Sequence, residues 1–189
     1  MSVSSNKDQF IFLLKEVQRD GVEDLLNWLE GTDFFTAPAS TRFHLSEEGG
    51  LCQHSLNVYR RLSVEAAQIM PKPSRDSIIL TGLLHDVCKA NFYTVEYRNA
   101  KNEYGQWEKV PYYTVKDQFP MGHGEKSVFL IERFLRLTEE EAIAIRWHMG
   151  GFDESVRGGS FSAGNAFELY PLAVALHVAD LKATYYAEI

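Results

Sequence analysis

Six side chains of the kinds that bind divalent metals occur in this chain in the order His, His-Asp, His, His, Asp. They are His54, His85, Asp86, His123, His148 and Asp180. These residues are far apart in the sequence, and most lie in segments with the apolar spacing of a helix. They can share one site only if several helices pack around it, as in metal sites at the centre of helical bundles. The series therefore predicts a mainly α-helical bundle.

Charged residues at core-facing positions support a shared interior site. Asp180 lies in the apolar run ALHVADL, four residues after Leu176, and His54 lies three residues after Leu51. A carboxylate at such a position is costly unless it is paired or bound to a metal. Imidazole and carboxylate ligands suit Mn, Fe, Co, Ni or Mg, and a series without cysteine argues against a structural zinc site.

Length and composition fit one globular domain. The chain has 189 residues, of which 45% are apolar and 24% charged. A net charge of −7 argues against an extended nucleic-acid surface but is compatible with a small phosphorylated ligand. The N-terminal apolar stretch is too short for a signal segment or membrane span, so we expect a soluble, cytoplasmic protein without a membrane partner. Cys52 and Cys88 are expected to be buried free thiols.

Hydrophobic spacing predicts the order of the elements. Helices are predicted over 7–30 (as one or two helices), 51–69, 74–89, 124–137, 138–149 and 170–187. Thr138 and Glu141 have the spacing of a capping box. Residues 92–115 are aromatic and β-branched around a turn-rich centre, which predicts a β-hairpin inserted between helices. The glycine-rich stretch 150–164 is predicted to be a loop.

Three residues near the series are candidates for binding an anion. Lys89 lies three residues after Asp86, so its ammonium can reach the same pocket. A cation beside metals must be directed at an anion, and a phosphate oxygen fits. The alternative is a lysine favoured by the end of a helix. Arg42 and His44 precede the helix of the first ligand; they either bind substrate or are ordinary loop residues.

The phrase GLLHDVCK at 82–89, with His54 before it and Asp180 after it, resembles the HD-domain superfamily of metal-dependent phosphohydrolases. The resemblance covers roughly residues 40–185 and implies an HD-domain helical bundle, in which the predicted β-hairpin at about 92–115 is an insertion. We therefore expect a single HD domain over 1–189. In it, 1–40 form an N-terminal helical extension and 41–189 form the metal-binding core.

The additional histidines resemble those of the binuclear branch of that superfamily. The resemblance implies two divalent metal ions, with Mn or Fe favoured, bridged by Asp86. The first ion would also be bound by His54, His85 and Asp180, and the second by His123 and His148.

The resemblance implies hydrolysis of a nucleotide or related phosphoester by a metal-bridging water. Asp86 and Lys89 would be catalytic, while Lys89, Arg42 and His44 would bind substrate; a short oligonucleotide end is also compatible. The alternatives are a mixed-valent diiron oxygenase on the same scaffold and a nucleotide-binding sensor without turnover. The hairpin enters between Asp86 and His123, so it is expected to be a lid or a specificity element. The sequence predicts no particular oligomeric state.

Overall fold

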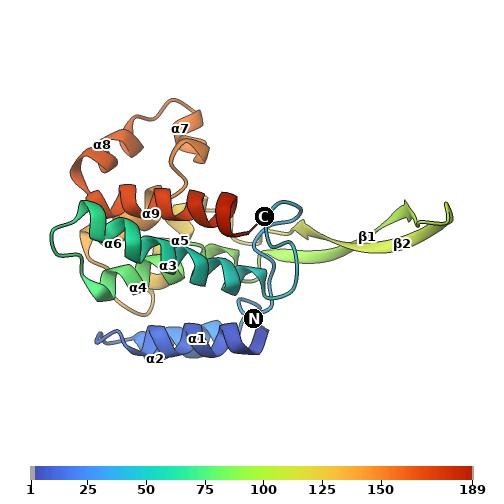
Figure 1. Cartoon of the computed structure of the whole chain (residues 1–189), viewed down its shortest axis with the longest axis horizontal. Helices are drawn as coiled ribbons and strands as arrows, with labels where there is room; N and C mark the ends of the chain where they lie inside the picture. Colours follow the sequence, from blue (N-terminus) through green and yellow to red (C-terminus); the bar gives the residue numbers. More distant parts are fainter. Residues whose placement is uncertain (1–2, 189) are drawn as a thin grey trace.

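The computed structural model describes residues 3–188, and most of them are helical (Figure 1). The α-helices are α1 (Val3–Lys15), α2 (Val22–Glu30), α3 (Gly50–Ile69), α4 (Arg75–Leu84), α5 (His123–Glu132), α6 (Glu139–Trp147), α7 (Glu154–Arg157), α8 (Ser162–Leu169) and α9 (Pro171–Lys182). Short turns of 3-10 helix, η1 (Val87–Lys89) and η2 (Gly150–Phe152), and a π-helical turn, η3 (Ala183–Ala187), complete the helical part. The predicted mainly α-helical fold with one inserted hairpin is confirmed.

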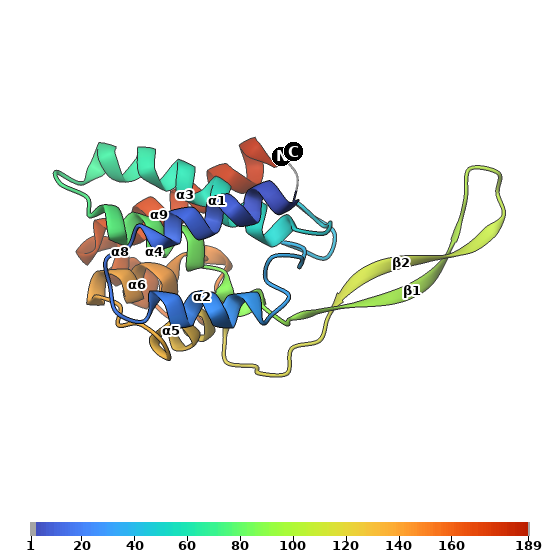
Figure 2. The ribbon, with the colours of Figure 1, turned by 90° about the horizontal axis from the view of Figure 1, so that it is seen from below.

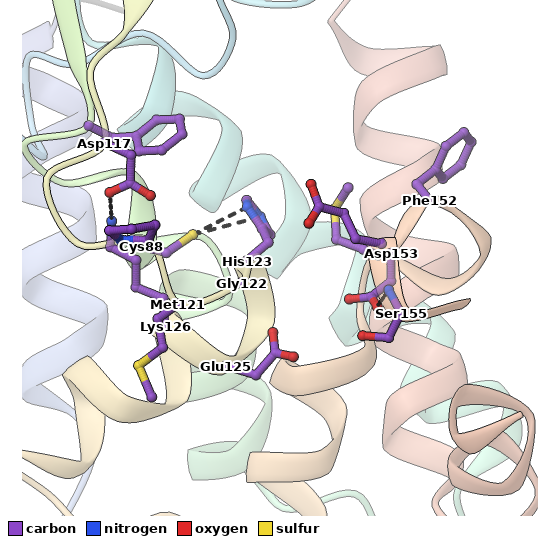
Figure 3. A pocket seen from close by; sticks show the side chains of 14 residues that line it. Cys88, Asp117, Met121, Gly122, His123, Glu125, Lys126, Phe152, Asp153 and Ser155 are labelled. Carbon is purple, nitrogen blue, oxygen red and sulfur yellow. Dashed lines mark hydrogen bonds and ion pairs between the residues drawn. The ribbon is translucent and has the colours of Figure 1, made fainter. Parts of the chain in front are cut away.

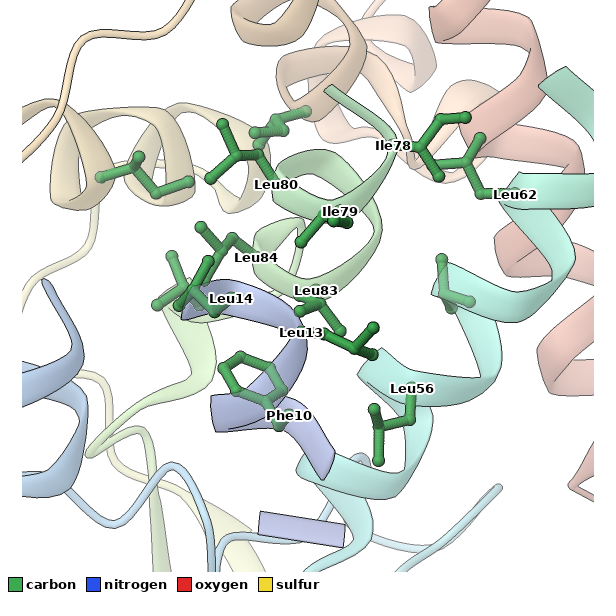
Figure 4. Packing of buried hydrophobic residues seen from close by; sticks show 14 of the residues in the cluster. Phe10, Leu13, Leu14, Leu56, Leu62, Ile78, Ile79, Leu80, Leu83 and Leu84 are labelled. Atoms are coloured by element: carbon green, nitrogen blue, oxygen red, sulfur yellow. The ribbon is translucent and has the colours of Figure 1, made fainter. Parts of the chain in front are cut away.

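Helices α3, α4, α6 and α9 form the centre of the bundle. Helix α3 lies against α9 and α4, while α6 lies against α9, α5 and α4. The first helix, α1, packs onto α3 and α4, and Phe10 and Leu14 on it are completely buried with Leu83 and Leu84 (Figure 4). Each such side chain contributes roughly 1.5–3 kcal/mol of burial free energy. Residues 3–30 therefore share the apolar core of the helices that follow.

The segment 7–30, predicted as one or two helices, belongs to two helices, and Gly21 directly precedes the second. Its φ of +89° is left-handed, and a Cβ there would collide with the backbone of Phe134. Glycine is the residue that tolerates both conditions. The predicted capping box is also present, because Thr138 and Glu141 exchange side-chain and backbone hydrogen bonds at the start of α6.

Helix α4 ends earlier than the sequence predicted. Ser74 caps its start by accepting a hydrogen bond from the Ser77 N–H, as expected, but the helix stops at Leu84 and not near Lys89. Asp86, with φ −104° and ψ 16°, has left the helical conformation before η1 begins. In a continuous helix His85 and Asp86 would point about 100° apart. The break allows both side chains to face the same interior cluster.

The inserted hairpin consists of β1 (Tyr93–Lys101) and β2 (Trp107–Val115), paired antiparallel with Tyr93 opposite Val115 and Lys101 opposite Trp107. It projects away from the helices as a long two-stranded arm (Figures 1 and 2). Near its tip, Tyr104 and Trp107 are 79% and 70% exposed. The tip therefore does not cover the helical body, and only the base of the hairpin lies next to it.

The glycine-rich stretch 150–164 was predicted to be a loop, and this is wrong in part. It contains η2, α7 and the start of α8. Asp153 accepts a hydrogen bond from the Ser155 N–H at the start of α7, and Ser160 accepts one from the Ser162 N–H at the start of α8. The side-chain cap of Asp153 stabilises the short helix α7 despite its glycine-rich surroundings. Within residues 3–188, no helix combines the length and the apolar character required to cross a membrane.

Candidate metal centre

The structure brings the six His and Asp residues of the series together at the centre of the bundle. They come from five places: α3 (His54), the break after α4 (His85 and Asp86), the start of α5 (His123), the end of α6 (His148) and α9 (Asp180). The His54 Nε2 atom lies 3.2 Å from both His85 Nε2 and an Asp180 oxygen. On the other side, Asp86 Oδ1 lies 2.6 Å from His123 Nε2 and 3.5 Å from His148 Nε2.

Two of the histidines are oriented by their own helices. His85 Nδ1 lies 3.0 Å from the Gly82 carbonyl oxygen, and His148 Nδ1 lies 2.7 Å from that of Ile145. A carbonyl can only accept, so Nδ1 carries the hydrogen and the Nε2 lone pair faces the cluster. The Nε2 atom of His148 is buried and has no hydrogen-bond partner among the described residues. An orphaned buried lone pair of this kind fits a metal ligand.

Asp86 is the centre of the cluster. It belongs to two compact groups whose possible ligand atoms lie within 4.8 Å of one another: one with His54 and His85, and one with His123 and His148. His85 and His148 also form such a group with Asp180. A carboxylate has two oxygens, so Asp86 can serve two ions. The cluster is compatible with a metal site of nitrogen and oxygen ligands.

The electrostatics of the cluster favour a positive charge at its centre. Burial disfavours ionisation of Asp180, but the hydrogen bond and charge of His54 hold its pKa well below the ordinary value. Burial also opposes a charge on His54, but Asp180 and Glu188 raise the pKa of this imidazole to about 10. For His85 burial dominates and lowers the pKa to about 3. Carboxylates therefore hold a cation next to a neutral imidazole, as they would hold a metal ion.

Lys89 contacts Asp86 directly, which the sequence did not predict. Its Nζ lies 2.6 Å from Asp86 Oδ2 and donates a hydrogen bond to the Ala39 carbonyl at 2.9 Å. Burial opposes the ammonium charge, but Asp86 raises its pKa. The Tyr93 hydroxyl, at the base of β1, donates to the same carbonyl. Lys89 is thus fixed at the edge of the cluster by two acceptors.

Two cavities open beside the cluster and meet at His123, Met149 and Phe152. The larger, of about 720 Å³, reaches the His54 side and is lined by, among others, Phe43, His44, Lys89, Arg157, Tyr185 and Glu188. The smaller, of about 610 Å³, contains Cys88 next to His123 and an ion pair of Lys126 with Asp117 (Figure 3).

Of the two loop residues predicted to contact substrate, His44 and Arg42, only His44 lines a cavity described above. His44 lines the larger cavity, 3.9 Å from a Glu188 oxygen. Arg42 instead lies over the ring of Phe43 at 5.3 Å, and it is not among the described residues that line either cavity. The cavity places Arg157 of α7 beside the cluster, although the glycine-rich sequence around it gave no such indication.

Glu188 was also missed. Both of its carboxylate oxygens lie 3.1 Å from His54 Nδ1, and one accepts a hydrogen bond from Asn57. Asn57 follows His54 by three residues, so helical spacing could have revealed it. Glu188 follows the aromatic stretch at the end of the chain, where no periodic pattern marks it.

A helical bundle that gathers four histidines and two aspartates in its interior has an arrangement compatible with a buried metal site of nitrogen and oxygen ligands. The family model of the HD domain matches residues 51–184, and the chain belongs to this family, which lies in a superfamily of metal-dependent phosphohydrolases. All six residues of the cluster lie within the matched part, whereas Glu188 lies beyond it. Neither a curated protein nor a solved structure matches the chain significantly.

Proposed function

We propose that the protein is a metal-dependent phosphohydrolase that acts on a nucleotide or a related small phosphoester. The observation that carries the proposal is the position of Asp86, which is shared by two potential ligand groups beside a cavity with cationic residues. The family supports the same reaction class. Without such a cavity, a cluster of His and Asp residues would fit a structural metal ion as well as a catalytic one.

The residues fit two divalent ions, with Mn or Fe favoured. Asp86 would contact both; the first would also be held by His54, His85 and Asp180, and the second by His123 and His148. When bound, such ions provide a nucleophilic water at neutral pH and polarise phosphoryl oxygens. The bundle contributes fixed ligand directions, because its helices and their backbone carbonyls already orient the imidazoles.

The larger cavity supplies the substrate contacts in this proposal. Lys89 and Arg157 bring positive charge to the region where the phosphate would lie, and His44 adds a hydrogen-bonding group. Phe43, Phe152 and Tyr185 are exposed aromatic side chains in its wall, suited to stacking on a base. A volume of about 720 Å³ is in the range of small-molecule sites.

Metal analysis combined with a phosphoester panel tests the proposal. Protein purified without chelator should approach two equivalents of metal and hydrolyse at least one nucleotide or small phosphodiester when loaded with Mn, Fe or Mg. Asp86→Ala should lose metal and activity together. Asp117→Asn is the matched control, because Asp117 pairs with Lys126 outside the cluster.

Three outcomes would contradict the proposal. Oxygen consumption without phosphate release would assign the site to an oxygenase. Binding of nucleotides without turnover under every metal would make the protein a sensor. A stoichiometry of one ion that is unchanged in His123→Ala and His148→Ala would remove the second metal.

A further inference from the structure

We infer that Glu188 is a positioning residue of the metal centre, holding His54 so that its Nε2 atom faces the cluster. The inference deepens the proposed function, because it rests on the same metal centre. The Glu188 carboxylate is completely buried, and both of its oxygens lie 3.1 Å from His54 Nδ1. The opposite ring nitrogen of His54 is the one that faces His85 and Asp180.

The side-chain amide of Asn57 shows that the Glu188 carboxylate is a hydrogen-bond acceptor. The oxygen of Asn57 accepts hydrogen bonds from Gln53 at 2.9 Å and Arg60 at 3.1 Å. The amide nitrogen of Asn57 is therefore the atom that points at Glu188, to which it donates at 2.9 Å. Glu188 is thus an acceptor from both Asn57 and His54. An ionised carboxylate accepts only, so His54 Nδ1 carries a hydrogen, and Nε2 is the ring atom that can bind a metal ion once it gives up its proton.

His54 differs in this respect from the other two oriented histidines. His85 and His148 donate from Nδ1 to backbone carbonyls of their own chain segments. His54 donates to a charged side chain that comes from beyond α9, just after the turn η3, which packs against α3. A carboxylate partner makes an imidazole a stronger ligand than a neutral carbonyl does, and removing such a partner commonly costs about 10–100-fold in metal affinity.

Glu188 lies outside residues 51–184, the part matched by the family model. The partner of His54 Nδ1 thus lies four residues beyond the end of the matched range. The expected consequence is selective: the ion on the His54 side depends on Glu188, whereas the ion held by His123 and His148 does not.

The test measures metal affinity in the full chain, by competition of Mn²⁺ or Co²⁺ with a chelator, for the wild type, Glu188→Ala and Glu188→Gln. Glu188→Ala should raise the Kd of one ion about 10–100-fold and leave the other unchanged. Glu188→Gln should lose less metal affinity than Glu188→Ala, because glutamine keeps the shape of the side chain and one acceptor oxygen. Tyr186→Ala is the matched control, because Tyr186 lies two residues earlier, in the turn η3, and is 75% exposed.

Two further readouts separate positioning from a general structural role. The visible spectrum of the Co²⁺-loaded protein should change in Glu188→Ala, and ¹⁵N NMR should show the hydrogen on Nδ1 of His54 in the wild type. In a His54→Ala background, Glu188→Ala should have no further effect on metal affinity. If Glu188→Ala destabilises the fold, the near-isosteric Glu188→Gln and the NMR assignment of the wild type still decide.

Metal binding by the wild type and by the Glu188 variants distinguishes a wrong positioning role from a wrong metal centre. If the wild type binds metal and both Glu188 variants bind it equally well, the positioning role is wrong and the metal centre stands. The same holds if the Nδ1 atom of wild-type His54 carries no hydrogen. If the wild type itself binds no divalent ion, the proposed metal centre is wrong.

Discussion

Replacing Arg19 with alanine should destabilise the bundle through contacts outside the His and Asp cluster. Arg19 lies between α1 and α2, and its two terminal nitrogens each donate to an oxygen of Glu141 at 2.6 Å. The Glu141 side chain is completely buried and also accepts from the Ser77 hydroxyl at 2.6 Å. Glu141 starts α6 and Ser77 lies on α4, so this carboxylate connects the N-terminal segment with two ligand-bearing helices.

The expected loss in the free energy of unfolding follows from the burial of the Arg19–Glu141 ion pair. Removing one partner of a fully buried ion pair costs about 3–5 kcal/mol, because the remaining charge is left without compensation. The Arg19 side chain is 22% exposed, so water replaces part of the lost interaction. We therefore expect a loss of about 2–4 kcal/mol. With an m-value of about 2–3 kcal/mol/M, the urea midpoint should fall by about 1 M.

Urea unfolding followed by circular dichroism measures this, with Arg136→Ala as the control. Arg136 forms an exposed pair with Glu132, at 3.3 Å and with 94% of its own side chain exposed. Exposed pairs contribute about 0–1 kcal/mol, so the control should remain near the wild type. Equal midpoints for the two variants at neutral pH would refute the assignment of Arg19 and Glu141 as a buried clamp.

The pH dependence gives an independent check with a defined sign. Burial opposes ionisation of Glu141, but the hydrogen bonds from Arg19, Ser77 and the Thr138 N–H lower its pKa below the ordinary 4.5. A lowered carboxyl pKa contributes stability that is present above the ordinary value and is lost as pH falls through the folded value. The difference between wild type and Arg19→Ala should therefore shrink below pH 4.5, and a constant difference would contradict the reasoning.

Three further predictions concern the site and its surroundings. Lys89→Ala should keep the metal content, because it removes a cation from Asp86. It should also lower kcat/KM about 10–1000-fold, and unchanged kinetics would make Lys89 a structural partner only. Replacing 96–110 with a short glycine-containing turn should leave fold and metal content intact, as checked by circular dichroism and metal analysis, while weakening discrimination among nucleotides; loss of metal would make the arm part of the core. Burial raises the pKa of Cys52 to about 12, so native Cys52 should resist iodoacetamide at pH 8 while unfolded protein is alkylated, as mass spectrometry will show.

The cluster could be predicted because its residues break the rules of an apolar core. Asp180 in the run ALHVADL and His54 near Leu51 occupy positions where a polar residue requires a partner. Helical spacing alone placed them toward the interior, and the capping pair Thr138 and Glu141 fixed the start of α6. These signals are local, and a single sequence contains them.

The remainder depends on contacts between distant segments. Nothing in the sequence shows that α4 ends at Leu84, because no proline directly follows it and the nearest glycine, Gly82, lies inside the helix. The partner of His54 is 134 residues away. The base of the hairpin is held by another distant contact, because the Tyr93 hydroxyl donates to the carbonyl of Ala39, 54 residues earlier. Each of these features is set by tertiary packing, which local spacing does not encode.

The two sides of the candidate metal centre depend differently on the rest of the chain. His85 and His148 are oriented by carbonyls three residues earlier, so their Nε2 atoms are aligned once the local helical turns form. Helices α4 and α6 are also connected at Glu141 of α6, which accepts a hydrogen bond from Ser77 of α4. Arg19, from the segment between α1 and α2, donates to the same carboxylate. Within residues 3–188, His54 has no such local acceptor, and its Nδ1 instead contacts Glu188, 134 residues later. The interior part of the site is therefore preorganised by the bundle, while its His54 side is completed only when the segment after α9 has packed against α3.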